Sequence, residues 1–172
     1  MKLSFSTKGW HEPTFDQFCD AAQDLRFQGI ELHNIYNRLF TDKDGAFHDY
    51  AAAATRRRLF EKGLGIPCID TVVNAAEGPT DRAVEEITRC LEIAANLSIP
   101  CVRLKAAATE DTAAAVAQVS ALVEQMLPVA QEQGVSLVIE TSGLFADTAR
   151  LRDLLDSFAC DYVAALWHWS AA

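Results

Sequence analysis

Short apolar runs of strand length alternate along the chain with longer segments whose apolar residues recur at helical spacing. In the first long segment, Phe15, Phe18 and Ala22 are spaced so that they share one helix face. Thr14 and Gln17 have the spacing of a capping box, which predicts that this helix begins at Thr14. Strands are predicted at residues 3–6, 30–33, 66–70, 101–104, 136–140 and 162–167.

Helices are predicted between these strands, at residues 14–26, 51–62, 81–96, 112–133 and 147–158. A regular alternation of strands and helices needs crossover connections, so the strands are predicted to be parallel and covered by helices. No segment rich in Pro, Gly or Ser interrupts the alternation, and residues 1–172 are therefore interpreted as a single domain. Pro128 is expected to bend the long fourth helix, and Gly134 to end it.

Two α/β architectures fit this order of elements. A doubly wound sheet accommodates six strands in 172 residues, but no strand–helix junction carries a G-x-G-x-x-G loop. A complete (βα)₈ barrel takes about 250 residues, which is more than this chain has. Ionisable residues at the C-terminal ends of several strands nevertheless favour the barrel, because barrel active sites are built there. The prediction is an incomplete TIM-type barrel of six parallel strands and about five helices.

The charge balance narrows the range of partners. The chain has 15 Lys plus Arg and 24 Asp plus Glu, a formal charge of −9, which argues against nucleic-acid binding. No run of about 20 uncharged apolar residues predicts a membrane span. The five cysteines lie in apolar segments without C-x-x-C spacing, as is typical of buried thiols in a reducing compartment. A cytoplasmic protein without nucleic-acid or membrane partners is expected.

Ionisable residues gather at or beside the C-terminal ends of the predicted strands. Alternation places Glu31 and His33 on one face of their strand, and Arg103 and Lys105 on one face of theirs. The others at these ends are Asp70, Glu140 and His168. In a parallel barrel these ends meet at one mouth, so the side chains are expected to converge. Such a cluster could bind a divalent metal and move protons.

Most of these residues also have a structural interpretation. Mid-strand positions make a buried ion pair between Glu31 and Arg103 the favoured interpretation for those two. The residues that could instead cap a turn or face solvent are His33, Asp70 and Lys105. Glu140 differs from them, because a carboxylate that ends an apolar strand needs a partner. For Glu140 a functional role is the favoured interpretation.

Three segments together resemble the sugar phosphate isomerase/epimerase family of the xylose isomerase-like TIM barrel superfamily. They are Gly-Ile-Glu-Leu-His at 29–33, Gly-Ile-Pro at 65–67, and Gly-Val-Ser-Leu-Val-Ile-Glu-Thr at 134–141. This superfamily also contains inosose dehydratases and endonuclease IV. The resemblance covers essentially the whole chain, as strands 1 to 6 of an eight-stranded barrel. A nuclease activity is disfavoured by the net charge of −9 and by the presence of only four histidines.

The resemblance implies metal-assisted proton transfer next to a carbonyl, or dehydration, on a sugar, inositol-like or keto substrate. Members of the family bind a divalent metal, often Mn²⁺, with Zn²⁺ or Mg²⁺ as alternatives. Glu140 matches the strand-5 glutamate that serves such enzymes as metal ligand and acid/base. The residues expected to bind the substrate are His33, Asp70, Lys105 and Trp10. Trp10 is expected in the wall of the site, with packing in the core as its alternative.

Two departures from the family pattern bear on activity. His168 stands where the family has an aspartate metal ligand, which removes one negative charge. The chain ends before the two strands expected to carry the remaining ligands, so weak metal binding by this chain alone is expected. The alternative is a non-catalytic barrel fragment or subunit that needs a partner to complete strands 7 and 8. Open sheet edges are then expected to pair with a second copy or a partner chain.

Overall fold

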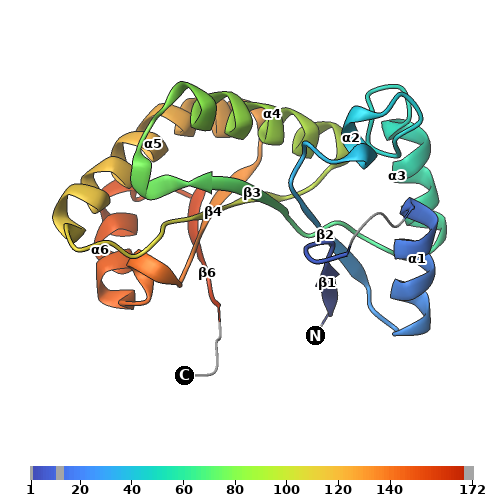
Figure 1. The fold of residues 1–172 in the computed structure, drawn as a ribbon, viewed down its shortest axis with the longest axis horizontal. Helices are drawn as coiled ribbons and strands as arrows, with labels where there is room; N and C mark the ends of the chain where they lie inside the picture. The colour runs from blue at the N-terminus through green and yellow to red at the C-terminus, as the bar shows by residue number, and fades with distance from the viewer. Residues whose placement is uncertain (1, 11–13, 169–172) are drawn as a thin grey trace.

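A computed structural model describes residues 2–10 and 14–168, and its strands form one curved parallel sheet (Figure 1). The six strands are ordered β1-β2-β3-β4-β5-β6, and every neighbouring pair is parallel. A doubly wound sheet would instead reverse its order beside the first strand. The strand order therefore confirms the predicted barrel-type architecture.

The observed elements follow the predicted alternation closely. The strands are β1 (Ser4–Ser6), β2 (Gly29–His33), β3 (Ile69–Asn74), β4 (Cys101–Lys105), β5 (Ser136–Glu140) and β6 (Val163–Leu166). The α-helices are α1 (Phe15–Asp24), α2 (Arg38–Thr41), α3 (Ala52–Glu61), α4 (Asp81–Leu97), α5 (Thr112–Gln133) and α6 (Thr148–Phe158). Two 3₁₀ turns, η1 (Ala75–Glu77) and η2 (Gly143–Phe145), follow β3 and β5.

Local sequence explains where the helices begin and end. Thr14 and Gln17 form the predicted reciprocal capping box at the start of α1. The helix α5 continues through Pro128 and ends at Gly134, whose φ of 66° is a left-handed conformation that glycine adopts without strain. The extra helix α2 has only four residues and is capped by the side chain of Asn37. So short a helix has no measurable apolar period, which is why it was not predicted.

The third strand lies later in the chain than its apolar pattern indicated. Residues 66–70 were predicted as a strand, whereas β3 runs from Ile69 to Asn74. Pro67 lacks a backbone N–H and cannot donate to a strand ladder. The segment before Ile69 therefore only accepts hydrogen bonds from β2, through the carbonyl oxygens of Gly65 and Cys68. The β3–β4 register shifts between Asp70 and Asn74, so the continuation of the strand contains a bulge. A bulge interrupts the alternation on which the prediction depended.

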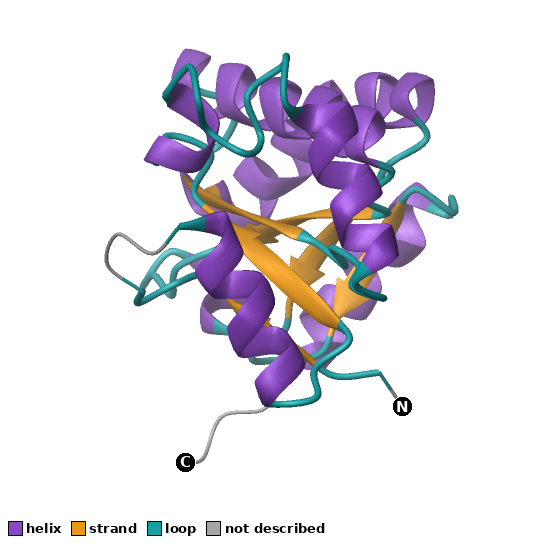
Figure 2. Cartoon of the chain, turned by 90° about the vertical axis from the view of Figure 1, so that its right-hand side faces the viewer, coloured by secondary structure: helices purple, strands orange, loops and turns teal. Residues whose placement is uncertain are grey.

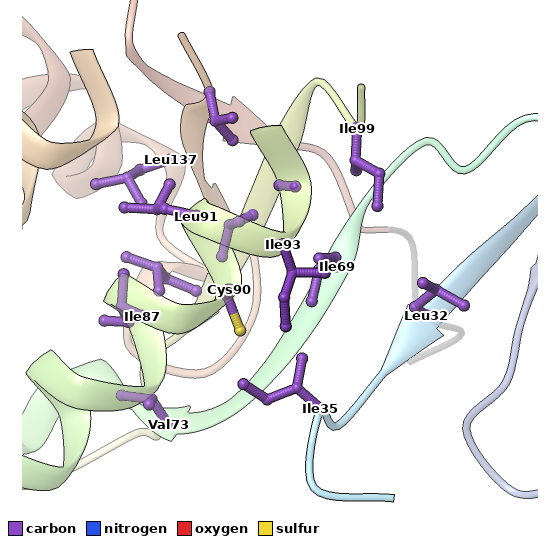
Figure 3. Close-up of a cluster of buried hydrophobic side chains, with 14 of the residues drawn as sticks. Leu32, Ile35, Ile69, Val73, Ile87, Cys90, Leu91, Ile93, Ile99 and Leu137 are labelled. Atoms are coloured by element: carbon purple, nitrogen blue, oxygen red, sulfur yellow. The ribbon is translucent and has the colours of Figure 1, made fainter. Parts of the chain in front are cut away.

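The helices lie along the outer side of the curved sheet (Figures 1 and 2). Strand side chains of one parity point toward them and form the hydrophobic core. Figure 3 shows this packing around α4 and β3, where apolar side chains from both elements interdigitate. The buried residues labelled there are Leu32, Ile35, Ile69, Val73, Ile87, Cys90, Leu91, Ile93, Ile99 and Leu137. The opposite parity of each strand faces the inner, concave side of the sheet.

The helix α5 is the one helix in the described part of the chain that is long and apolar enough to cross a membrane. It packs against α4, β5 and η1. Val119, Leu122 and Val123 on its packed side are fully buried. These contacts make α5 a covering helix of the sheet, in the same layer as α4.

Candidate active site

Asp70 stands at the centre of a polar cluster on the concave face of the sheet. It lies in β3 and is fully buried, with 0% of its surface exposed. His33 Nδ1, from β2, lies 2.7 Å from Asp70 Oδ2. From β4, Arg103 Nη2 lies 2.6 Å from Oδ2 and Lys105 Nζ lies 2.8 Å from Oδ1. Each oxygen of this buried carboxylate therefore has at least one hydrogen-bond donor, which offsets the loss of hydration.

The electrostatics of this cluster favour the ionised forms of its members. Burial alone raises the pKa of the Asp70 carboxyl, but hydrogen bonds and attraction from Arg103 and Lys105 outweigh it. The pKa of Asp70 is therefore lowered from its ordinary value. Burial by itself lowers the pKa of Arg103, because it disfavours the charged guanidinium. The hydrogen bond and the attraction from Asp70 outweigh burial, so the pKa of Arg103 is raised overall. Asp70 is an anion and Arg103 a cation at neutral pH.

Arg103 connects Asp70 with two further carboxylates. Its Nη1 lies 3.2 Å from Glu31 Oε2, and its Nε lies 3.4 Å from Glu140 Oε2. The side chains of Arg103 and Glu31 are only 13% and 14% exposed. The structure thus contains the predicted buried ion pair between these two residues. It also shows that this pair belongs to a larger network that extends from β2 to β5.

Glu140 ends β5 at the edge of this network and is only 6% exposed. The hydroxyl of Ser142 donates a hydrogen bond of 2.7 Å to Glu140 Oε1. His168 Nδ1, just after β6, lies 3.7 Å from the same oxygen. The backbone N–H of His168 donates to Thr141 Oγ1 at 2.7 Å, which holds the segment after β6 beside the end of β5. Glu140 is thus held in position by contacts from β4, from the turn after β5 and from the segment after β6.

Five of the predicted site residues are brought together by these contacts. They are His33, Asp70, Lys105, Glu140 and His168. Their positions agree with the expected convergence of strand ends at one mouth. Asp70 is a buried ion-pair partner rather than a turn cap, and Lys105 pairs with it while its own side chain stays 25% exposed. Which roles these residues have in binding or catalysis remains a prediction.

Trp10 lies apart from this cluster. Its ring is 5.5 Å from the rings of Phe5 and Phe18, measured between centroids, on the helix-covered side of β1. It lines a separate cavity of about 600 Å³, together with Thr7, Phe15 and Tyr36. Thr7 links the two regions, since its hydroxyl accepts the backbone N–H of His33 at 2.8 Å. The structure therefore places Trp10 in the wall of this separate cavity and outside the network of charges.

Sequence reasoning did not identify Ser142 or Glu86 as residues of interest. Ser142 follows Glu140 by two positions, and a short polar side chain after a strand-end carboxylate is the signal that could have found it. Glu86 lies on α4 and accepts the backbone N–H of Val72 at 2.7 Å, at the bulge of β3. It is 1% exposed, and its Oε2 atom has no hydrogen-bond partner among residues 2–10 and 14–168. Its position three residues after Ala83 and four before Cys90, on the apolar face of the helix, is the signal that separates it from the exposed Glu85.

The described residues do not fit a complete metal site. Within residues 2–10 and 14–168 there is no group of three or more His, Cys, Asp or Glu side chains placed to hold a metal ion. Glu140 and His168 together supply two ligands, whereas Mn²⁺ or Zn²⁺ in proteins takes about four or more. The Arg103 guanidinium, 3.4 Å from Glu140, places a positive charge beside these two ligands. Metal binding by this part of the chain is therefore expected to be weak.

The fold and this strand-end cluster define an α/β-barrel protein, and comparison with known families identifies which kind. The family model for the xylose isomerase-like TIM barrel matches residues 19–172, so the chain belongs to this family. No curated protein matched the sequence.

Solved structures of the same fold include several sugar-active enzymes. A D-psicose 3-epimerase determined in the presence of D-fructose superposes with a TM-score of 0.74 at 15% identity, over 97% of this chain and 63% of that one. The 3-keto-D-glucoside 4-epimerase YcjR from E. coli gives 0.74 at 14% identity, over 97% and 68%. The IOLI protein with a bound zinc atom gives 0.72 at 12% identity, over 95% and 61%. This chain thus spans less than two thirds of the epimerase in the first comparison, and these likenesses establish the fold.

Proposed function

We propose that this chain carries the substrate-binding and proton-transferring part of a sugar isomerase or epimerase that acts next to a carbonyl group. The observation that carries the proposal is Glu140, a buried carboxylate at the C-terminal end of β5. It lies within a cluster of polar side chains from neighbouring strands. The family's relatives include epimerases for D-psicose and for a 3-keto-D-glucoside, which supports a carbohydrate with a carbonyl group as substrate.

Glu140 is the residue proposed to move the proton. A hydroxyl from Ser142 and the guanidinium of Arg103 each engage one of its oxygens, which fixes the carboxylate plane. A fixed carboxylate can remove the proton from the carbon beside a carbonyl and return it on the same or the other face. His168, 3.7 Å from Glu140 Oε1, is placed to donate a hydrogen bond to an oxygen of the same ligand.

His33 and Lys105 are proposed to bind hydroxyl groups of the substrate. Their side chains are 22% and 25% exposed, so they are the accessible members of the cluster around the fully buried Asp70. Asp70 engages His33 at Nδ1 and so orients the ring, while Nε2 accepts or donates no hydrogen bond among residues 2–10 and 14–168. The Lys105 ammonium carries three protons and can donate to a ligand while it stays paired with Asp70. Asp70 acts here through the two side chains that it holds.

Hydrogen exchange into the substrate tests this proposal directly. The protein is incubated with D-fructose and MnCl₂ in D₂O, and loss of the carbon-bound proton next to the carbonyl is followed by NMR. Wild-type protein is expected to catalyse exchange, and Glu140→Gln to reduce its rate by about 10²- to 10⁴-fold. Glu132→Gln, on the exposed side of α5, is the matched control and is expected to leave the rate unchanged. Equal rates for wild type and Glu140→Gln would contradict the role of Glu140.

A non-catalytic sugar-binding subunit is the second candidate, and one observation favours it. Both Asp70 and Glu140 already have cationic partners, so neither carboxylate is left unpaired for chemistry. In the same experiment this alternative predicts no exchange above the background. Sugar binding, measured as a change in the NMR line width of D-fructose, would still be lost in Lys105→Met. The two candidates therefore give different results with one set of samples.

A further inference from the structure

Two cysteines face each other at the beginning of β3 and β4. Cys68 directly precedes β3, and Cys101 is the first residue of β4. In the ladder between these strands Ile69 pairs with Val102, so the preceding residue of each strand places Cys68 opposite Cys101. Ile69 and Val102 are fully buried in the core on the helix side. By alternation, both cysteine side chains point to the other face, one layer below Asp70 and Arg103.

Contacts of the two sulfur atoms agree with this placement. Cys101 Sγ lies 3.2 Å from the carbonyl oxygen of Pro67, so it is directed toward the chain that leads into β3. A hydrogen bond with the Cys101 side chain is the largest cause of the raised pKa of Cys68, and burial adds to it. The same hydrogen bond lowers the pKa of Cys101. The strand register and the contact of Cys101 Sγ with Pro67 place the two thiols beside each other, and the lowered pKa makes Cys101 the thiol that ionises first.

The backbone spacing is compatible with a disulfide. Neighbouring strands lie about 4.7–4.9 Å apart, and the Cα atoms of disulfide-linked cysteines are about 4.4–6.8 Å apart. Both cysteines are reduced in this structure. Cys101 is partly exposed and Cys68 is buried, so an oxidant reaches Cys101 first. This arrangement has an attacking thiol at the surface and a second thiol behind it.

We propose that Cys68 and Cys101 are a reversible oxidation site, which a hydroperoxide converts to a disulfide between β3 and β4. In the first step the Cys101 thiolate attacks the peroxide, the O–O bond breaks, and protonation of the leaving oxygen releases water from hydrogen peroxide. This leaves a sulfenic acid on Cys101. In the second step the Cys68 sulfur attacks the Cys101 sulfur, the S–O bond breaks, and a second water leaves with the Cys68 proton. The two sulfurs are oxidised by two electrons together, and the peroxide is reduced.

The position of this disulfide connects it with the polar cluster above. Asp70 and Arg103 each follow one of the two cysteines by two residues on the same face. A covalent bond at this place holds β3 and β4 in the register that pairs Asp70 with Arg103. The other described cysteines offer no such pair: Cys19 and Cys90 are fully buried, and Cys160 lies after α6.

Mass spectrometry of the oxidised protein tests the proposal. The reduced 172-residue chain is treated with one equivalent of hydrogen peroxide, alkylated, and digested with trypsin without reduction. Formation of the disulfide removes two hydrogens, about 2 Da, and links the peptide 63–82 to the peptide 90–103. The second peptide carries both Cys90 and Cys101, so fragmentation within it must place the link on Cys101. Dithiothreitol is expected to reverse the modification completely.

Variants separate this reaction from unspecific oxidation. Cys101→Ser is expected to abolish the linked peptide, whereas Cys160→Ser, at the other partly exposed cysteine, is the matched control and leaves its yield unchanged. The proposal is overturned by a link that maps to Cys90 or Cys160. It is equally overturned by sulfinic acid at Cys101 without any linked peptide. Because mapping of the wild-type protein alone decides the result, the test does not depend on how well a variant folds.

Discussion

Asp70 and Arg103 form a two-point ion pair across β3 and β4, with Arg103 Nε 3.0 Å from Oδ1 and Nη2 2.6 Å from Oδ2. The two residues are direct partners in the strand ladder, so the backbone itself brings the side chains together. Two parallel contacts between a guanidinium and a carboxylate fix both distance and orientation. The remaining nitrogen of Arg103, Nη1, then reaches Glu31, and its Nε also reaches Glu140.

Replacing Asp70 with Asn is expected to lower the free energy of unfolding by about 3–5 kcal/mol at pH 7, because it leaves Arg103 and Lys105 without the buried anion that they share. Urea unfolding followed by circular dichroism measures this loss. Asp153→Asn is the control, since its ion pair with Arg152 is exposed and its loss is expected to leave the stability nearly unchanged. A loss of less than 1 kcal/mol in Asp70→Asn would contradict the central role of the carboxylate.

The same carboxylate gives a pH dependence of known sign. The pKa of Asp70 is lower in the folded protein than its ordinary value of 3.8. Its stabilising contribution is therefore complete above that ordinary pKa and is lost as the pH falls through the folded pKa. The difference in unfolding free energy between wild type and Asp70→Asn is expected to stay constant from about pH 7 to pH 5 and to shrink below about pH 4. A difference that grows on acidification would show that the sign is wrong.

The main elements of the fold were predictable because each leaves a local signal. Alternating apolar runs gave the strands, and Thr14 with Gln17 marked the beginning of α1. Strand parity alone placed Glu31 with His33 and Arg103 with Lys105 on common faces. That Asp70 joins His33, Arg103 and Lys105 was not predictable, since the contacts depend on how neighbouring strands are staggered. The β3 bulge arises from tertiary packing, which no local pattern records. The burial of Glu86 does have a local signal, its helical spacing from Ala83 and Cys90.

Glu86 is expected to destabilise the protein at neutral pH. Burial raises the pKa of this carboxyl, an effect that the hydrogen bond from Val72 and attraction from Arg82 only partly offset. Because the folded pKa is raised, the contribution to stability is complete below the ordinary pKa of 4.5 and declines as the pH rises through the folded pKa. Asp70 and His33 on the neighbouring strands are the other charged groups that influence Glu86.

Glu86→Gln is therefore expected to raise the free energy of unfolding by about 1 kcal/mol at pH 7. The amide keeps an acceptor for the Val72 N–H and carries no charge that must be buried. The gain should vanish near pH 4, where the wild-type carboxyl is itself protonated. Glu85→Gln, exposed on the same helix turn, serves as control and should change the stability by less than about 0.5 kcal/mol at either pH. Equal effects of the two substitutions would mean that burial of Glu86 is unimportant.

Metal binding by the 172-residue chain is expected to be weak and easily reversed by dialysis. Glu140 and His168 supply two ligands, and the guanidinium of Arg103 repels a cation at this place. Isothermal titration with Mn²⁺ and with Zn²⁺ measures the affinity, and His168→Ala should weaken it further. His48→Ala, in the loop before α3, provides the comparison for unspecific loss of an imidazole. A one-to-one site with a dissociation constant below about 1 μM would contradict this expectation, because two ligands do not supply such affinity.

Association through the sheet edges is the last expectation, and it concerns β1 and β6. In the described part of the chain these are the two edge strands, and Figure 1 shows them at opposite ends of the curved sheet. Unpaired N–H and C=O groups at an edge pair readily with another strand unless a charge or a proline prevents it. The strand β6 consists of Val163–Leu166 and has neither, and Trp167 after it is 76% exposed. We therefore expect the 172-residue chain on its own to associate with a second copy through these edges.

Light scattering over a dilution series measures the mass, and Ala165→Lys should shift the protein toward the monomer. Ala53→Lys, on the exposed side of α3, adds the same charge away from the edges and should leave the mass unchanged. A monomeric mass at micromolar concentration, with cooperative unfolding and no binding of a dye for apolar surface, would show that the edges are already satisfied within one chain.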